Sequence, residues 1–273
     1  MPPAICHATC PATFGDALRN WRTRRGMSQL ALALHAEVSA RHLSWLERGK
    51  SQPSRAMVLR LAQRLDLPLR ERNALLVAAG YAPLYRESAL SDPALAPARA
   101  ALQRLLDAHE PAPALAVDGH WNLVASNRML PLLLRQADPA LLKPPINVLR
   151  VSLHPLGLGG AIENAAAWRA HVLQRLQRQI AASGDAELLR LHAELQALPM
   201  VPNAEVTSPI DIDDFAVPLV LRSPFGRLCF ITTVTVFGAP HDVTLSELAI
   251  ETLLPADEAT AARLREIQAT LKP

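Results

Sequence analysis

Apolar residues in the first third of the chain recur at the three- and four-residue spacing of amphipathic helices. The pattern predicts a helix over 14–25, two short helices within 29–49, a fourth helix opened by Ser54 and a fifth that ends at Ala79. The expected inward positions are Phe14, Leu18, Trp21, Leu32, Ala33, Ala36, Leu43, Leu46, Val58, Leu61, Ala62 and Leu65. Five short helices with apolar faces to bury predict a small all-α domain.

The second and third of these helices are joined by a tight turn, and each follows a serine. The hydroxyls of Ser28 and Ser39 are expected to accept hydrogen bonds from free backbone N–H groups of the first turn. Gly49 is expected to end the third helix in a left-handed conformation. The outer face of that helix then carries Ala40, Arg41, Ser44 and Trp45, framed by Arg48, Lys50 and Arg55. An exposed helix of this composition suits the major groove of DNA.

A β-hairpin is expected after the helical domain. Two apolar runs within 114–127 flank the pair Asp118-Gly119, which predicts a two-residue turn between strands. Asn127 is then expected to cap a helix that continues to Leu134.

Helices and then strands are expected in the rest of the chain. Residues 147–200 are helical in pattern, whereas 215–254 are rich in Val, Ile, Thr and Phe around a Phe225-Gly226 turn and predict strands. A last helix is expected over 257–271. Helices gathered on an antiparallel sheet predict an α+β fold for this part, so that the protein is multidomain.

Charge is distributed unevenly between these two parts. Residues 1–85 hold 12 Lys and Arg against 5 Asp and Glu, whereas the remainder holds 16 against 20. A basic N-terminal part beside an acidic remainder fits phosphate binding by the first part alone. The chain has no apolar run long enough for a membrane span and no secretory signal at its start, so we expect no membrane partner and a cytoplasmic, nucleoid-associated location.

The sequence offers little catalytic or metal-binding chemistry. Cys6, His7 and Cys10 lack a fourth ligand at a sensible spacing, so no metal site is expected. No nucleophile elbow, P-loop, dinucleotide fingerprint or HExxH motif appears, and the glycines at 157, 159 and 160 lack the preceding strand of a phosphate loop. We therefore expect no enzyme and no bound cofactor.

The segment from Phe14 to about Tyr85 resembles the helix-turn-helix domain of the phage-repressor/Cro superfamily, the xenobiotic-response-element family. The similarity is carried by RRGMSQ at 24–29, Ala33, VS at 38–39 and LERGKSQPS at 46–54. It implies a lambda-repressor-like fold and a structural ion pair between Arg22 and Glu47. Glu37 stands where the family usually has glycine. A left-handed conformation at this turn costs about 1 kcal/mol for a residue other than glycine.

The resemblance also assigns roles to individual residues. It implies that Gln29 contacts a DNA phosphate, that Ala40, Arg41, Ser44 and Trp45 face bases, and that Arg48 and Lys50 contact the DNA backbone. The candidate DNA-binding residues are therefore Ser28, Gln29, Ser39, Ala40, Arg41, Ser44, Trp45, Arg48, Lys50 and Arg55.

The segment 65–85 narrows the similarity to MmyB-like regulators, which carry a C-terminal ligand-binding domain. Asn147, His154-Pro155-Gly157, Asn164, Trp168, Asp185 and Leu188 match the pattern of that domain. The resemblance implies a PAS-like fold that encloses a fatty-acid-like molecule, and the low aromatic content also suits an aliphatic ligand.

The candidate ligand-binding residues are Trp121, His154, Asn164 and Trp168. His154 either lines the pocket or braces a helix junction, and the two tryptophans either contact the ligand or fill the core. The implied organisation is a tail over 1–12, a helix-turn-helix domain over 13–85, a linker over 86–98 and a PAS-like domain over 99–273.

These observations favour a transcription regulator that binds a near-palindromic DNA operator as a homodimer and responds to a small apolar effector. One recognition helix buries too little surface for tight specific binding, hence the dimer. Two alternatives remain open. In one, the C-terminal domain serves only for oligomerisation or a protein partner; in the other, it is an enzyme with an accessory DNA-binding domain.

Overall fold

The structure, a computed structural model, describes residues 13–199, 216–238 and 240–271. The chain divides into two compact units. Unit 1 consists of Met1–Glu87 and His241–Val243, and unit 2 of Ser88–Pro240 and Thr244–Pro273. Within the described ranges, no helix combines the length and the apolar character that a membrane crossing needs.

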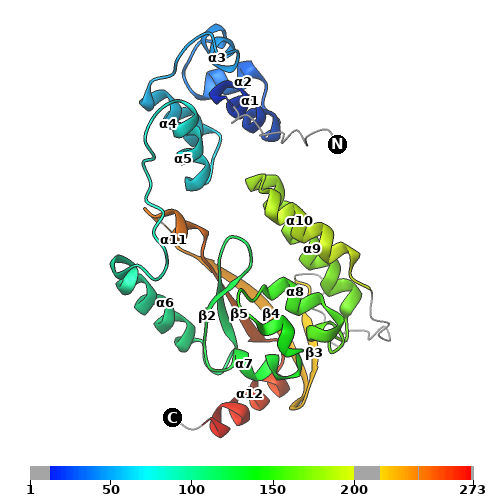
Figure 1. Cartoon of the computed structure of the whole chain (residues 1–273). Coiled ribbons are helices and arrows are strands. Elements are labelled where there is room, and N and C mark those ends of the chain that lie inside the picture. The colour runs from blue at the N-terminus through cyan, green and yellow to red at the C-terminus, as the bar shows by residue number, and fades with distance from the viewer. Residues whose placement is uncertain (1–12, 200–215, 239, 272–273) are drawn as a thin grey trace, which may run out of the picture. The chain divides into compact units, whose positions relative to one another are not determined.

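Unit 1 is the predicted all-α domain (Figure 1). Its helices are α1 (Phe14–Arg24), α2 (Gln29–His35), α3 (Ala40–Glu47), α4 (Arg55–Arg64) and α5 (Leu69–Ala78). All of the expected inward positions are buried in one cluster, which Leu67, Leu75 and Leu76 complete. The helical spacing of apolar residues therefore identified the core of this unit correctly.

Local hydrogen bonds fix where these helices begin. The side-chain oxygens of Thr13, Ser28, Ser39 and Ser54 each accept from the backbone N–H three residues further on. Close packing then fixes α3 against α1, because a Cβ atom at Gly15 would lie 2.6 Å from the carbonyl oxygen of Glu47. The position of α3 thus depends on a glycine in α1.

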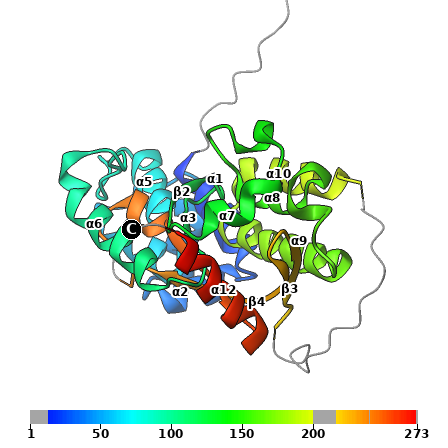
Figure 2. The ribbon, with the colours of Figure 1, turned by 90° about the horizontal axis from the view of Figure 1, so that it is seen from below.

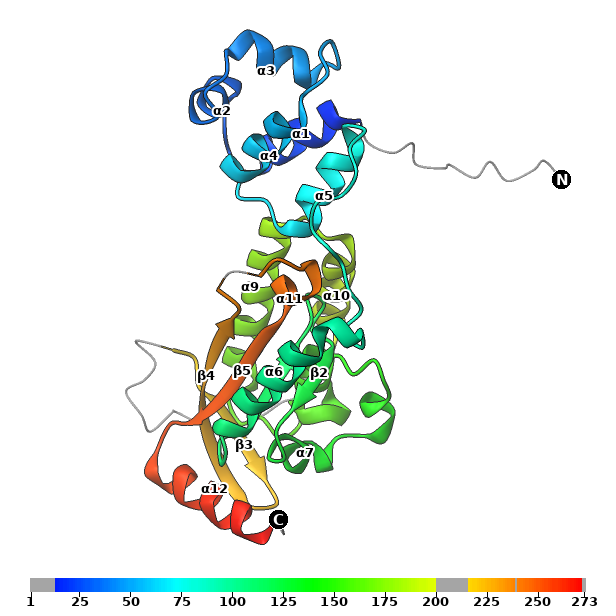
Figure 3. The same ribbon diagram turned by 90° about the vertical axis from the view of Figure 1, so that its left-hand side faces the viewer.

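Unit 2 is built on one antiparallel five-stranded sheet with the order β2-β1-β5-β4-β3 (Figure 3). The strands are β1 (Ala114–Val117), β2 (Leu123–Ser126), β3 (Leu219–Ser223), β4 (Gly226–Val236) and β5 (Ala249–Pro255). The central strand β5 pairs with both β1 and β4. In this register Glu251 lies between Leu115 of β1 and Val234 of β4.

Helices cover both faces of this sheet. They are α6 (Ala96–Ala108), α7 (Leu130–Leu133), α8 (Val148–Leu153), α9 (Ala165–Ser183), α10 (Ala186–Ala197), α11 (Val243–Glu247) and α12 (Glu258–Thr270). Ala114 and Ala116 of β1 pack in a small cluster with α6, whereas Leu115 and Val117 join the main core with α7, α8, α9 and α12. The helices α9 and α10 lie side by side next to α8 (Figure 2). The predicted α+β class is confirmed.

Three local predictions are corrected. The hairpin turn spans 118–122 rather than two residues, because the Asp118 carboxylate accepts from the backbone N–H groups of His120 and Asn122 and holds a longer turn. Residues 243–247 form α11 and not a strand. The third correction concerns Asn127, which does not cap α7.

Asn127 is instead a buried brace between segments. Its Oδ1 atom accepts from the N–H groups of Ala114 and Met129, and its Nδ2 atom donates to the carbonyls of Leu106 and Ala112. Burial demands that all these polar atoms be satisfied, and the neighbouring backbone satisfies them. The cap prediction failed because it used only the residues that follow Asn127 in the chain.

The glycine-containing segment after α8 is a tight turn over Pro155–Gly159 with a kink at Gly157, whose φ and ψ are −94° and −128°. A Cβ atom at Gly157 would lie 2.1 Å from the carbonyl oxygen of Val151. The glycine is therefore required by close approach of the turn to α8, which gives it a packing role.

Candidate functional site

The exposed face of α3 is the first candidate site. Leu43 and Leu46 are fully buried, and on the opposite side Arg41 and Trp45 are exposed. The Arg41 guanidinium carbon lies 4.6 Å from the centroid of the Trp45 ring. This stacking holds a planar set of N–H donors on the outer face of the helix.

A buried carboxylate anchors α3 from below. Glu47 accepts from Arg22 Nε at 2.6 Å and from Arg22 Nη2 at 3.0 Å, so the pair is bidentate. Gln29 Nε2 donates to the same carboxylate at 2.7 Å, and Arg19 lies 3.6 Å away. The predicted Arg22–Glu47 ion pair is confirmed in the structure, and it locks α1, α2 and α3 together.

The Glu47 carboxylate stays ionised despite its burial. Desolvation raises the pKa of Glu47, but the hydrogen bonds from Arg22 and Gln29 and the charges of Arg22 and Arg19 outweigh it and hold the pKa below its ordinary value. The anchor is therefore a salt bridge and keeps its charge at neutral pH.

The other predicted DNA-binding residues lie around this helix. The Ser28 and Ser39 hydroxyls act as helix caps, and Gln29 is half-buried through its bond to Glu47. Arg48 Nε donates to the Ser44 carbonyl at 3.0 Å. Ala40 and Ser44 are half-buried on α3, whereas Arg48, Lys50 and Arg55 are exposed at or beyond its C-terminal end.

The turn between α2 and α3 adopts the left-handed conformation for which the helix-turn-helix family that the sequence resembles usually has glycine. Glu37 has a φ of 55°, in the left-handed region, and its side chain is exposed. The turn thus keeps its left-handed residue, without a glycine, at a cost of about 1 kcal/mol.

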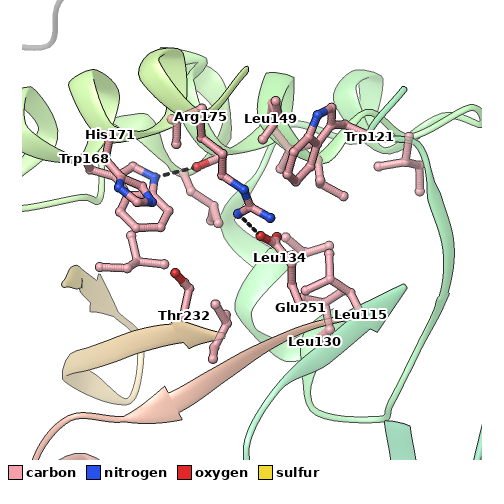
Figure 4. A pocket seen from close by; sticks show the side chains of 18 residues that line it. Leu115, Trp121, Leu130, Leu134, Leu149, Trp168, His171, Arg175, Thr232 and Glu251 are labelled. Atoms are coloured by element: carbon pink, nitrogen blue, oxygen red, sulfur yellow. Dashed lines mark hydrogen bonds and ion pairs between the residues drawn. The ribbon is translucent and has the colours of Figure 1, made fainter. Parts of the chain in front are cut away.

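The second candidate site is a cavity in unit 2, of about 80 Å³, which lies between α8, α9 and the sheet (Figure 4). Its walls are mostly aliphatic and aromatic. They include Leu115, Leu130, Ile146, Leu149, Val172, Leu219 and Leu253 together with Trp121 and Trp168. Of the four predicted ligand-binding residues, the structure brings the two tryptophans to this cavity.

Trp121 is held at the cavity by several contacts. Its φ is 68°, a left-handed conformation that is rare for a bulky residue. Its indole N–H donates to Gln179 Oε1 at 2.7 Å, and Gln179 Nε2 donates to the Gly119 carbonyl at 2.8 Å. Strain of this kind persists where surrounding contacts over-determine it, as they do here.

An ion pair lies in this otherwise apolar lining. Arg175 of α9 donates through Nη1 to Glu251 Oε1 of β5. The Arg175 guanidinium carbon also lies 4.4 Å from the centroid of the Trp121 ring. Figure 4 shows Arg175 reaching down from α9 between the two tryptophans toward Glu251 on the strand below.

Trp168 forms the opposite wall with His171. The Trp168 indole N–H donates to Ser152 Oγ at 2.9 Å, and the two rings stack with centroids 5.5 Å apart. Burial, and then the charges of Arg175 and Arg178, lower the pKa of His171 below its ordinary value. The imidazole is therefore neutral at neutral pH and adds no charge to the cavity.

His154 and Asn164 are not brought to the cavity. His154 Nδ1 accepts from the Leu156 N–H at 3.0 Å, which fits the interpretation of a helix-junction brace. Asn164 Nδ2 donates to the Pro218 carbonyl, and its Oδ1 accepts from the Val220 N–H. Both side chains satisfy nearby backbone groups.

The sequence reasoning missed Arg175, Glu251 and His171. A usable pattern existed, because Arg175 follows Trp168 by seven residues and so shares the apolar face of α9. Glu251 is likewise a single charge within an apolar strand segment. Their pairing across 76 residues, however, needs the tertiary structure. Cys6, His7 and Cys10, at which no metal site was expected, lie outside the described residues.

Comparison with known families identifies both units. Residues 98–267, more than half of the chain, match the family described as MmyB-like transcription regulator ligand binding domain. Residues 13–75 match a helix-turn-helix domain family. No curated protein matches the chain.

Two solved structures are similar to part of the chain. The restriction-modification controller protein C.AhdI from Aeromonas hydrophila is 36% identical over 22% of this chain and 92% of its own, with a TM-score of 0.22. An HTH_3 family transcriptional regulator from Vibrio cholerae is 30% identical over 24% of this chain and 36% of its own, also with a TM-score of 0.22.

Proposed function

The chain belongs to the MmyB-like transcription regulators, and we propose that an apolar effector in the cavity of unit 2 controls how tightly unit 1 binds its operator. The protein is a DNA-binding transcription regulator with a helix-turn-helix domain and a ligand-binding domain, and it is not an enzyme. The observation that supports the proposal is an apolar cavity in the matched ligand-binding domain.

The DNA side of the proposal rests on α3. Its exposed face carries Arg41 and Trp45 in contact, with Ser44 beside them, and these side chains read base edges in the major groove. The backbone-contacting set is Ser28, Gln29, Ser39, Arg48, Lys50 and Arg55. The Gln29 amide has two N–H donors, so one remains for a phosphate after its bond to Glu47.

The matched substitutions Arg41→Ala and Lys50→Ala test this assignment. Arg41→Ala removes a base reader, so we expect it to cost about 1–3 kcal/mol on the preferred site and to relax base preference at one position. Lys50→Ala is expected to weaken binding to every duplex and to reduce the slope of log K against log salt by about one unit. Fluorescence anisotropy over a salt series measures both. An equal loss on all sequences for Arg41→Ala would remove it from the base-reading set.

The protein is proposed to bind as a homodimer on a near-palindromic operator of the nucleoid DNA. A single short recognition helix buries too little surface for tight specific binding, and two-fold symmetry doubles it. Selection of bound sequences from random duplex is expected to return two related half-sites whose centres lie about 10 base pairs apart, or a multiple of that. A single unrepeated half-site, with a monomer in sedimentation, would contradict the dimer.

The effector is proposed to be a small fatty-acid-like molecule. The apolar walls favour an acyl chain, but about 80 Å³ is below the roughly 300–1,000 Å³ of typical ligand pockets. A short chain therefore fits with little change, whereas a longer chain enters only if the lining helices move apart. Effector binding is expected to change operator affinity by about 1–3 kcal/mol in coupling free energy.

Thermal shifts with straight-chain acids from butyrate to myristate test the effector. We expect the melting temperature to rise most for one intermediate chain length, and the same compound to change the Kd for operator DNA. If denaturing extraction of the purified protein releases no acyl compound and none raises the melting temperature, the effector is wrong. Unit 2 would then serve for oligomerisation or a protein partner, which is the alternative function.

A further inference from the structure

The charge in the cavity lining is concentrated at one point. Among the described lining residues, Arg175 and Glu251 are the charged pair, and His171 is the other titratable group. The Arg175 and Glu251 side chains are 25% and 11% exposed. A charge is expensive to bury in an apolar wall unless it is paired and hydrogen-bonded.

The Arg175 guanidinium does not have a complete set of partners. A guanidinium carries five N–H donors in a planar fork. Among the residues that the structure describes, its one hydrogen bond is to Glu251, and its carbon atom lies over the Trp121 ring. Donors therefore remain at the cavity for a second acceptor.

The geometry around Arg175 fixes where that acceptor lies. Trp121 is held by Gln179, and Gln179 is one helical turn from Arg175 on the same helix. The guanidinium thus lies over the ring and donates through Nη1 to Glu251 on the strand below. A planar carboxylate matches this edge in the two-point manner that Arg prefers.

We infer that Arg175 is the residue that binds a carboxylate on the effector, and that Glu251 is an internal competitor for the same guanidinium. This inference rests on the proposed function, because it names the chemical class of the ligand in that cavity. The effector is then a monocarboxylate with an apolar tail against Leu115, Leu149 and Val172. A doubly charged phosphate is disfavoured, since one guanidinium beside Glu251 would leave negative charge uncompensated in an apolar wall.

Exchange of partners gives ligand binding a structural consequence. Glu251 sits in the middle of β5, between Leu115 of β1 and Val234 of β4. A ligand carboxylate that bonds at two points to the guanidinium edge that includes Nη1 takes an unused donor together with the Nη1 donor that now bonds Glu251, so Glu251 loses its hydrogen bond. Binding of an acid therefore changes the contacts of Glu251 in the central strand β5, whereas binding of a neutral apolar compound does not.

The test compares hexanoate with 1-hexanol on the full chain by isothermal titration calorimetry. The two probes share their tail and differ in the carboxylate. We expect wild type to bind hexanoate about tenfold tighter than 1-hexanol, and Arg175→Met to lose that preference. Glu251→Gln is expected to raise hexanoate affinity about tenfold, since the competitor has lost its charge, and to leave 1-hexanol within about twofold.

A matched control lies on the same helix. Arg178 is exposed and does not line the cavity, so Arg178→Met should keep the wild-type preference. Circular dichroism and the melting temperature of each variant show whether it is folded. If Arg175→Met is unfolded, Glu251→Gln alone decides the result, because it should tighten the binding of hexanoate and leave that of 1-hexanol nearly unchanged.

The outcomes separate the two hypotheses. Equal affinity of wild type for the acid and the alcohol, or hexanoate binding unchanged in Arg175→Met and Glu251→Gln, overturns the inference and leaves the apolar effector in place. Failure of every acid and alcohol, from four-carbon butyrate and butanol upward, contradicts the proposed effector itself and the inference with it.

Discussion

The Arg22–Glu47 pair of unit 1 and the Arg175–Glu251 pair of unit 2 differ in their burial and in the number of hydrogen bonds that they form. In unit 1 the Arg22 and Glu47 side chains are 11% and 0% exposed, and Glu47 accepts three hydrogen bonds from Arg22 and Gln29. In unit 2, among the described residues, a single hydrogen bond joins Arg175 to Glu251 beside the cavity. The same two residue types therefore occupy very different environments.

The difference separates a structural pair from an exchangeable one. In a buried pair whose carboxylate already accepts several hydrogen bonds, removing one partner leaves a charge without solvent or hydrogen bonds. Such a pair therefore resists exchange of partners. A pair with unused donors next to a cavity can accept another partner at lower cost. The first pair fixes the shape of a DNA-binding surface, and the second suits a site whose state depends on a ligand.

The largest expected effect comes from the Arg22–Glu47 pair. Glu47→Gln leaves the buried Arg22 guanidinium without its counter-charge, so we expect a loss of about 3–5 kcal/mol in the free energy of unfolding of unit 1. DNA binding should fall with it, because α3 is anchored through this residue. Scanning calorimetry with denaturant titration measures the loss.

The matched control is Glu37→Gln. Glu37 pairs with Arg64 at 3.6 Å, but the two side chains are 76% and 49% exposed. An exposed pair contributes about 0–1 kcal/mol, so this variant should unfold close to wild type. Equal losses in the two glutamine variants would show that burial and saturation do not distinguish the Glu47 pair.

Glu251→Gln is expected to have a smaller effect on unit 2. Arg175 keeps its contact with the Trp121 ring and remains partly exposed, so the loss in unfolding free energy should be about 1 kcal/mol. Chemical denaturation followed by tryptophan fluorescence gives the value. A loss as large as that of Glu47→Gln would mean that both pairs are structural, and the distinction between them would fail.

The two sites also differ in what the sequence could predict. The caps at Ser28 and Ser39 and the outer face of α3 depend on residues within one or two helical turns, so local pattern was sufficient. The cavity depends on which segments meet across the fold. Arg175 and Glu251 belong to a helix and a strand far apart in the chain, and no local pattern pairs them.

The misplaced ligand candidates show the same limit. His154 and Asn164 were chosen as polar residues in a matched pattern, but their side chains satisfy backbone groups of nearby segments. The fold class and the helical core were predictable because periodicity encodes burial. Polar satisfaction is not periodic, so Asn127 and the longer 118–122 turn were predicted wrongly.

Left-handed residues give a second contrast between the units. Glu37 has a φ of 55° and an exposed side chain. Among the described residues, its strained backbone supports only the exposed ion pair of this side chain with Arg64. Trp121 has a φ of 68°, and its ring is held over Arg175. Glu37→Gly should therefore raise the unfolding free energy of unit 1 by about 0.5–1 kcal/mol, as relief of strain exceeds the added chain entropy. Urea titration at equilibrium tests the sign, and a destabilised glycine variant would contradict it.

The smallest expected effect is a pH dependence confined to unit 2. His120 lies beside Trp121, and its Nε2 atom is 2.9 Å from Asp185 Oδ2 and 3.7 Å from Glu187. Burial lowers the pKa of His120, but the hydrogen bond to Asp185 and the charges of Asp185, Glu187 and Asp118 outweigh it, so the pKa is raised. Burial raises the pKa of Asp185, but the hydrogen bonds from His120 and from the first backbone N–H groups of α10 outweigh burial, so the pKa is lowered.

The signs of these shifts define the pH window. A raised histidine pKa stabilises the fold fully below the unfolded value of about 6.5, and the contribution disappears as pH rises through the folded value. The lowered pKa of Asp185 means that its carboxylate stabilises the fold above about pH 3.9, and this contribution is lost only as pH falls through the folded value. Between about pH 6 and pH 8, the His120 pair should therefore lose a few tenths of a kcal/mol, which suits a half-exposed pair. The lowered pKa of His171 acts in the opposite direction over the same range, because the fold favours its neutral form. His120→Gln should remove the loss and leave the rise that comes from His171, whereas His35→Gln, on the exposed end of α2, should keep the wild-type slope. Unit 1 should show little slope in this range, because the pKa of Arg22 is raised and that of Glu47 is lowered, away from neutrality. Urea denaturation at the two pH values measures each slope, and an unchanged slope in His120→Gln would assign the pH dependence to another group.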